Sequence, residues 1–227
     1  GDLDGAEALA QEALELHRTL QQPLGEVSAL VALARVERAR GRSAAAVARS
    51  DEALARFEPL HQALDDVEQR ALFLATQHAV YDIGIAARLD RHRAEPAAGH
   101  AAHALELSER GRSRSLLDLL ERVGAAAPLP DDGAVDPPRL DAATLRALLE
   151  PESDDTVLLE FFLGQEASVL WWVTPTEIVA FELPARATVE SLARRAQSAV
   201  SSLGGSRAEA HEALAALGAM LLGPVAD

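Results

Sequence analysis

The sequence predicts a mainly α-helical chain of 227 residues, in which an α-solenoid of helical repeats precedes part of an α/β domain. Two observations lead to this fold class. A pattern of glycine, alanine and leucine recurs after 40 residues in the N-terminal part, as is typical of stacked helix pairs. Near Pro151 the spacing of apolar residues changes from the helical period of about 3.6 to the strand period of about 2.

Small residues at fixed spacing define the repeat. Each glycine stands where one helix is expected to end, a place that favours a residue tolerant of positive φ. The two alanines of each copy are seven residues apart on one helical face, where they let a neighbouring helix approach closely. The matching residues are Gly1, Ala6, Ala13 and Leu14 in the first copy, and Gly41, Ala46, Ala53 and Leu54 in the second.

Residues 1–60 are therefore expected to form the helical repeats. Residues 25–40 carry apolar side chains at helical spacing, and Pro23 fits the loop or the first turn in front of them. The unit is thus a helix, a glycine turn, a second helix and a loop. Residues 1–20 correspond to the second helix of a preceding unit.

A pair of long helices is expected over residues 61–124. Two stretches, residues 65–93 and 101–123, show apolar stripes of helical period. Pro96 and Gly99 interrupt the pattern between them. The pair is expected to connect the repeats to the second part of the chain.

The second part is expected to follow a linker. Residues 125–138 contain four prolines and three aspartates, a composition typical of linkers. Residues 139–227 are then the N-terminal part of the α/β domain. They begin with a short helix over residues 140–149, for which Asp141 is the expected N-cap.

Three strands are expected after Pro151. Residues 156–163, 168–174 and 178–183 are rich in β-branched and aromatic residues, and short loops separate them, so we predict a three-stranded antiparallel meander. The middle strand is apolar on both faces and so requires cover on both sides, which three strands alone cannot supply, and we expect that further polypeptide is needed to cover the second face. Two helices, residues 188–203 and 207–222, are expected next.

Charge and composition exclude several classes of partner. The net charge of −15 argues against nucleic-acid binding, because nucleic acids attract basic surfaces. The longest apolar stretch, residues 213–226, is too short to span a bilayer, so no membrane association is expected. The chain has no cysteine, which fits a reducing compartment, and we expect a cytoplasmic protein. Because the chain opens within the repeat pattern, we also expect its natural N-terminus to lie further upstream.

The repeat resembles the tetratricopeptide repeat (TPR) in a variant with long loops. The segment ALELSERGRSRSLLDLL, residues 104–120, resembles the helix that leads from such repeats into a CHAT domain. The segment DDTVLLEFFLGQEASVLWWVTPTEIVAFELP, residues 154–184, resembles the opening strands of the CHAT domain itself. The tail, residues 211–227, is similar to the helix before the central strands of that domain.

CHAT domains are similar to caspases and separases. The resemblance implies a cysteine peptidase in which a histidine and a cysteine at the ends of adjacent strands carry the reaction. Neither motif matches a position of this chain, so no catalytic residue and no cofactor are assigned to it. The expected partners are a protein or peptide in the TPR groove and the remainder of the CHAT domain. The alternative is a non-catalytic TPR scaffold with a degenerate α/β domain.

The groove formed by the first helices of the repeats is the peptide-binding surface that the resemblance implies. On residues 25–40, one face carries Ser28, Val31, Arg35 and Arg38. The two arginines are suited to an acidic peptide or a C-terminal carboxylate. The alternative is that they pair with acidic residues of the next helix.

Arg110 and Arg114 form a second candidate site, for an anion or for the partner domain. They lie four residues apart, on one helical face, and two guanidinium groups suit a phosphate or a carboxylate. The alternative is local pairing with acidic neighbours at helical spacing, which are Glu106, Glu109 and Asp118.

Histidines and tryptophans are expected to have structural roles. His100 and His103 share a helical face near His92, but no acidic third ligand has a suitable spacing, so no metal site is assigned. Trp171 and Trp172 are adjacent on a strand and point to opposite faces, which favours core positions on either side of a sheet.

Overall fold

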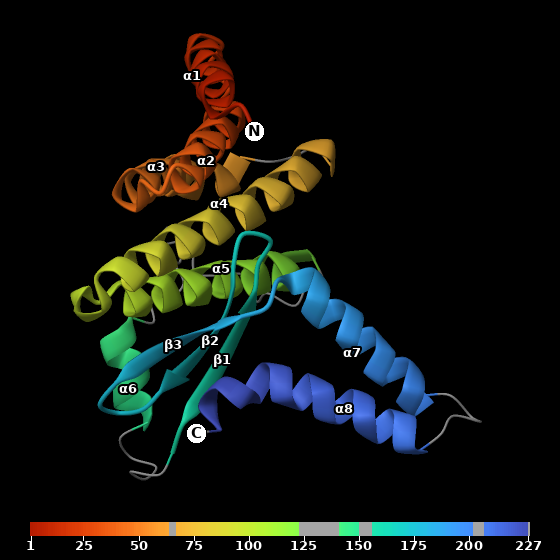
Figure 1. Ribbon diagram of the computed structural model, residues 1–227. Helices are drawn as coiled ribbons and strands as arrows, with labels where there is room; N and C mark the ends of the chain where they lie inside the picture. Colours follow the sequence, from red (N-terminus) through yellow and green to blue (C-terminus); the bar gives the residue numbers. More distant parts are fainter. Residues whose placement is uncertain (64–66, 123–140, 150–155, 202–206, 227) are drawn as a thin grey trace. The chain divides into compact units, whose positions relative to one another are not determined.

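The computed structural model describes residues 1–63, 67–122, 141–149, 156–201 and 207–226 (Figure 1). The chain divides into two compact units, Gly1–Ala143 and Thr144–Asp227. The expected linker over residues 125–138 lies outside the described residues. The prediction of a mainly helical chain with one three-stranded antiparallel sheet is confirmed.

The first unit is a succession of helices. Pro23 occupies the first turn of the second helix, as predicted, and the Asp2 carboxylate caps the first helix by accepting a hydrogen bond from the Gly5 N–H at 2.9 Å. The elements are α1 (Leu3–Thr19), α2 (Pro23–Ala39), α3 (Ser43–Phe57), the 3-10 helix η1 (Glu58–Ala63), α4 (Val67–Ala94), the 3-10 helix η2 (Pro96–Ala98) and α5 (His100–Arg122).

Each helix of the first unit packs on the next one along the chain, and α2 also packs on α4. Helix α2 consequently has three helical neighbours, α1, α3 and α4. Eight of its side chains are buried, against two for α1. The alanines of the second repeat copy, Ala46 and Ala53, are fully buried in α3, as expected for positions of close helix approach. A stacked ring pair, Phe57 and Phe73, joins α3 to α4 with centroids 4.6 Å apart.

Two successive turns in this unit have the same backbone geometry. At the end of α2, Gly41 has a φ of +71° and its N–H donates to the Arg38 carbonyl at 2.8 Å. At the end of α1, Gln21 has a φ of +53° and its N–H donates to the Arg18 carbonyl at 3.2 Å. Both residues adopt the left-handed backbone conformation that commonly ends a right-handed α-helix. The sequence indicated the turn at Gly41, but a glutamine gives no signal for the equivalent turn 20 residues earlier.

The second unit holds the sheet. Its strands are β1 (Leu158–Leu163), β2 (Ser168–Val173) and β3 (Ile178–Leu183), ordered β1-β2-β3 and antiparallel. In register, Trp171 lies opposite Glu160 of β1 and Ala180 of β3. Two tight turns connect the strands, closed by hydrogen bonds from the Gly164 N–H to the Ala167 carbonyl and from the Thr174 N–H to the Glu177 carbonyl, each 3.0 Å long.

The central strand β2 is the most buried strand of the second unit. Val169, Leu170, Trp171 and Val173 are fully buried, whereas Trp172 is half-buried. Since successive side chains of a strand point to opposite faces, both faces of β2 are covered at these positions. On the face that was expected to need further polypeptide, the described residues already bury Leu170 fully and leave Trp172 half-buried, so that expectation is wrong at Leu170.

Helices precede and follow the sheet along the chain. Helix α6 (Ala142–Leu149) spans the division between the two units, and α7 (Arg186–Ser201), α8 (Arg207–Leu222) and the 3-10 helix η3 (Gly223–Val225) follow the sheet. Helices α7 and α8 pack on each other. Among the described residues, none of the helices has the length and apolarity needed to cross a lipid bilayer.

Candidate functional site

The four residues predicted to bind a peptide lie along α2, but they do not share one exposed surface. Ser28 and Arg35 are exposed, two turns apart. Val31 is buried, with 2% of its surface accessible. Arg38 is largely buried, and its Nε donates to Asp90 Oδ2 of α4 at 2.6 Å. Arg38 therefore pairs with an acidic residue, as in the alternative considered for it, but this residue belongs to α4 and not to the next helix, α3. Ser28 and Arg35 lie on the surface.

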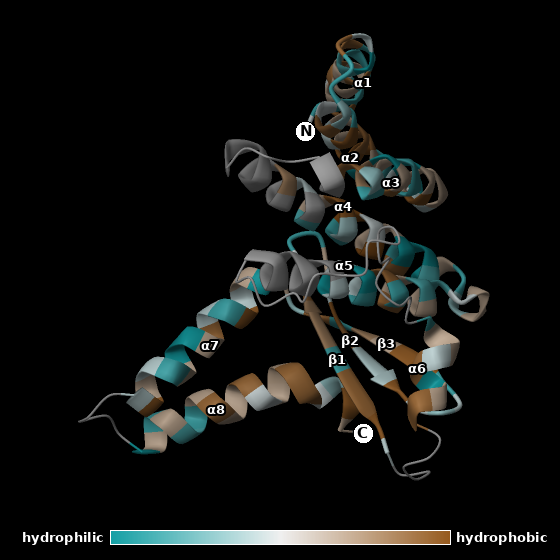
Figure 2. Cartoon of the chain, turned by 180° about the vertical axis from the view of Figure 1, so that it is seen from behind, coloured by the Kyte–Doolittle hydropathy of each residue, from teal (hydrophilic) through white to brown (hydrophobic). Residues whose placement is uncertain are grey.

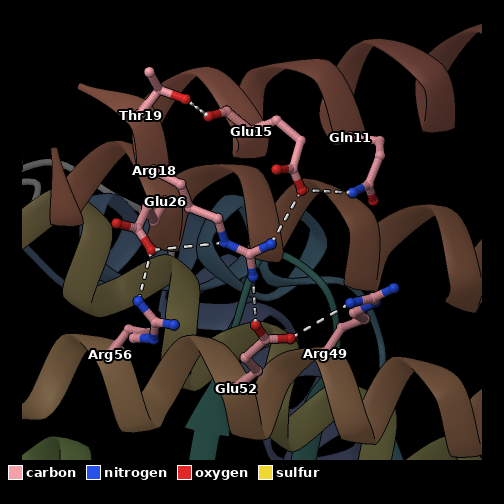
Figure 3. Close-up of polar contacts among 8 residues, drawn as sticks. All are labelled: Gln11, Glu15, Arg18, Thr19, Glu26, Arg49, Glu52 and Arg56. Carbon is pink, nitrogen blue, oxygen red and sulfur yellow. Dashed lines mark hydrogen bonds and ion pairs between the residues drawn. The ribbon is translucent and has the colours of Figure 1, made fainter. Parts of the chain in front are cut away.

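An ion-pair network links α1, α2 and α3 (Figure 3). Arg18 of α1 is at its centre, with Nη2 2.9 Å from Glu52 Oε1 of α3 and Nε 4.0 Å from Glu26 Oε2 of α2. Arg56 of α3 donates to the same Glu26 oxygen at 2.7 Å, and Arg49 lies 3.4 Å from Glu52. Two carboxylates are thus shared by three arginines from two helices.

Glu26 is the buried member of this network. Only 7% of its surface is accessible, and it lies in the first turn of α2, where the helix dipole favours a negative charge. The outer edge of the network is exposed, where Gln11 and Arg18 both bond Glu15. Paired carboxylates and guanidinium groups offer neither a nucleophile nor a free proton donor, so this arrangement stabilises helix packing.

Further arginines of the first unit also join different elements. Arg88 of α4 donates to Asp51 of α3 at 2.6 Å, and Arg40, the C-cap residue of α2, bonds both Asp4 and Glu7 of α1. The hydrogen bond to Glu7 raises the pKa of Arg40, while burial opposes the rise and the charges of Glu7, Asp4 and Glu37 add to it. The unit is thus linked by arginine–carboxylate contacts in addition to its apolar core.

A pocket with a volume of about 470 Å³ lies among α3, α4, α5 and the residue before α6. Its lining comprises two arginines, two histidines, three acidic residues and two apolar residues. Arg110, one of the two predicted anion-binding residues, lines it and pairs with Glu58 of η1. The lining residues are Val47, Asp51, Arg88, His100, His103, Glu106, Leu107, Arg110 and Asp141.

The charges of this pocket are largely engaged within the chain. Arg110 contacts Glu58, which is 52 residues away, and Arg88 pairs with Asp51 at 2.6 Å. Glu106 accepts a hydrogen bond from the Ala142 N–H at the start of α6, at 3.0 Å. The side chain of Arg114 lies outside the described residues, so the predicted pair of Arg110 and Arg114 is described for Arg110 alone.

One of the two histidines that line this pocket, His100, lies close to a carboxylate. His100 Nε2 lies 3.6 Å from Glu95 Oε2. In the part of the chain that the structure describes, no group of three or more histidine, aspartate or glutamate side chains is placed to hold a metal ion. The chain has no cysteine, so it carries no cysteine nucleophile of its own.

The network around Arg18 and Glu26 was not predicted from the sequence. Arg18 and Glu52 are 34 residues apart, and Arg56 and Glu26 are 30 apart, so no helical spacing rule connects them. The one local signal was a glutamate in the first turn of a predicted helix. Comparisons of the chain with models of protein families, with curated proteins and with solved structures gave no match.

Proposed function

We propose that residues 1–60 are a protein-interaction repeat module, which a pair of long helices over residues 61–124 connects to the N-terminal, non-catalytic portion of a caspase-like CHAT cysteine peptidase. Three features support the proposal: helices that each pack on the next, a left-handed cap repeated at Gln21 and Gly41, and the antiparallel meander of the second unit. The resemblance of residues 104–120 and 154–184 to CHAT proteins supplies the family.

The ligand of the module is an acidic peptide segment bound at the exposed face of α2. The observation that carries this part is the placement of Arg35, which is exposed on α2 one turn away from Arg38. Asp90 holds Arg38, whereas the Ser28 hydroxyl bonds the Leu24 carbonyl at 2.9 Å within its own helix. Because three other helices pack against α2, its backbone is fixed. The Arg35 guanidinium group can therefore bind a carboxylate without rearrangement of the backbone.

Reversing the charge of Arg35 is expected to weaken binding of an acidic peptide. A short labelled peptide with two glutamates and a free C-terminal carboxylate should bind the chain, and Arg35→Glu should lower its affinity about tenfold, which corresponds to about 1.4 kcal/mol. Fluorescence anisotropy at low and high salt measures both the affinity and its electrostatic part.

The matched control is Arg195→Glu, which reverses the charge of an exposed arginine in the second unit and should leave the affinity unchanged. A control peptide with glutamine in place of glutamate and an amidated end should bind more weakly to the unaltered chain. Equal binding by the Arg35→Glu and Arg195→Glu variants would contradict this binding site.

Helix α8 supports the assignment of the second unit to a larger α/β domain. Its C-terminal part, residues 213–222, has no charged side chain and is largely brown in Figure 2, yet Ala213 is the buried residue of the helix, and Leu214 and Leu222 are about half exposed. A helix that is apolar all round is ordinarily buried. We infer that further polypeptide of the CHAT domain covers α8.

The peptidase part of the proposal is tested on the whole protein that carries this chain. We expect it to cleave peptide substrates and to lose this activity when the cysteine at a strand end of its CHAT domain is changed to alanine. A whole protein that lacks a histidine and a cysteine at adjacent strand ends, or that cleaves nothing, would instead support the non-catalytic scaffold.

A further inference from the structure

Helix α6 belongs to both units of the chain. Its first two residues, Ala142 and Ala143, lie in the first unit, whereas residues 144–149 belong to the second. A helix of eight residues is too short to be stable in water by itself. Its stability therefore depends on the contacts that each unit makes with its own part of the helix.

A side chain of α5 holds the first turn of α6. The Ala142 N–H donates a hydrogen bond to Glu106 Oε1 at 3.0 Å. This N–H is one of the donors that an α-helix leaves without an intrahelical acceptor at its N-terminus, where the helix dipole also favours a carboxylate. Because only 8% of the surface of Ala142 is accessible, water replaces this acceptor poorly when the Glu106 carboxylate is removed.

The helix that carries Glu106 is itself fixed in the first unit. Leu105, the residue before Glu106, is fully buried. One turn further along α5, Arg110 pairs with Glu58 of η1, the 3-10 helix that follows α3. Helix α5 therefore connects the end of α3, through Glu58, to the beginning of α6, through Ala142.

We propose that Glu106 couples the second unit to the first by holding the start of α6. While the Glu106 carboxylate accepts the Ala142 N–H, α6 is helical from its first residue and is anchored to α5. When this hydrogen bond is lost, the first turn of α6 unfolds, and residues 144–149 lose the helical turn that precedes them. A change in the first unit that moves α5 is therefore transmitted to the second unit through α6. This coupling depends neither on the proposed peptidase family nor on the acidic-peptide site at Arg35.

Hydrogen exchange of the full chain tests whether Glu106 holds α6. Glu106→Ala should make the amide protons of residues 142–149 exchange about tenfold faster, because the capping hydrogen bond and its charge are both lost. Glu106→Gln keeps an acceptor oxygen but not the charge, so the exchange rate should return to within about threefold of that of the unaltered chain. Mass spectrometry of peptic peptides measures these rates.

The matched control is Glu109→Ala, the same substitution on the same helix. Glu109 pairs with Arg112 of its own helix at 3.3 Å, so its loss should leave the exchange of residues 142–149 unchanged. Exchange of residues 101–113 in each variant shows whether α5 itself stays folded.

Urea unfolding of the same variants tests whether the hold on α6 reaches the second unit. Both tryptophans of the chain lie in β2, so their fluorescence follows the unfolding of the second unit. Glu106→Ala should lower the urea midpoint of the fluorescence transition by about 0.5 M, and Glu106→Gln should recover most of this shift. Glu109→Ala should leave the midpoint unchanged.

Three results would overturn the proposal. Unchanged exchange of residues 142–149 in Glu106→Ala would show that Glu106 does not hold α6. Faster exchange of these residues with an unchanged fluorescence midpoint would show that the start of α6 unfolds without effect on the second unit. Faster exchange throughout α5, without recovery in Glu106→Gln, would show that Glu106 stabilises only its own helix.

Discussion

Replacing Trp171 by alanine is expected to lower the free energy of unfolding of the second unit by about 3–5 kcal/mol. Trp171 is fully buried in the central strand, between Glu160 of β1 and Ala180 of β3. Its removal leaves a cavity that the flanking strands cannot fill without breaking their hydrogen-bonded register. A loss of this size is a large part of the stability of a small domain.

The neighbouring residue provides a matched control. Trp172 is half-buried and points to the opposite face of β2, so Trp172→Ala should lower the free energy of unfolding of the second unit by about 1–2 kcal/mol. The chain has two tryptophans, both in β2, so fluorescence of the remaining tryptophan during urea unfolding reports on the second unit in either variant. Far-ultraviolet circular dichroism follows the helices of the first unit. Equal losses for the two variants would contradict the difference in burial.

The second large effect is expected at Glu26. Changing Glu26 to alanine removes the carboxylate shared by Arg18 and Arg56 and leaves the Arg56 guanidinium without its 2.7 Å partner. Loss of one member of a buried ion pair lowers the free energy of unfolding by about 3–5 kcal/mol. Because the Arg56 side chain is half exposed, we expect a smaller decrease, about 2 kcal/mol, in the free energy of unfolding of the first unit. Urea unfolding followed by circular dichroism measures the loss.

A double-mutant cycle separates the pair from the rest of the network. Glu26 and Arg56 should show a coupling energy of about 1 kcal/mol, and Glu26 and Arg18, whose atoms are 4.0 Å apart, a smaller one. The control is Glu15→Ala, because Glu15 belongs to the exposed edge of the network and its loss should change stability by less than about 0.5 kcal/mol. A Glu26→Ala variant as stable as Glu15→Ala would show that the buried network contributes nothing.

Local patterns were sufficient to predict most of the elements. The apolar period located α4, predicted over residues 65–93 and observed at Val67–Ala94, and the three strands within two residues of their ends. The turn at Gly41 was predicted because glycine adopts positive φ without strain. These features depend on residues close in sequence, so a single sequence contains their signal.

The site depends on contacts that the sequence does not encode locally. Arg38 and Arg110 each pair with an acid 52 residues away, because the packing of consecutive helices brings distant turns together. For Arg110, spacing within its own helix suggested Glu106 or Glu109 and gave no reason to choose Glu58. Val31 was expected on a binding surface, but it is buried. Helix α2 packs against three other helices, which leaves fewer of its side chains facing solvent than packing against two would.

Because α1 is less buried than α2, we expect local unfolding in the first unit to occur more readily in α1 than in α2. Helix α2 has eight buried side chains and α1 has two. The local unfolding that exposes the amide protons of α1 to exchange with solvent therefore requires less free energy than the local unfolding of α2. The amide protons of α1 are therefore expected to be less protected than those of α2.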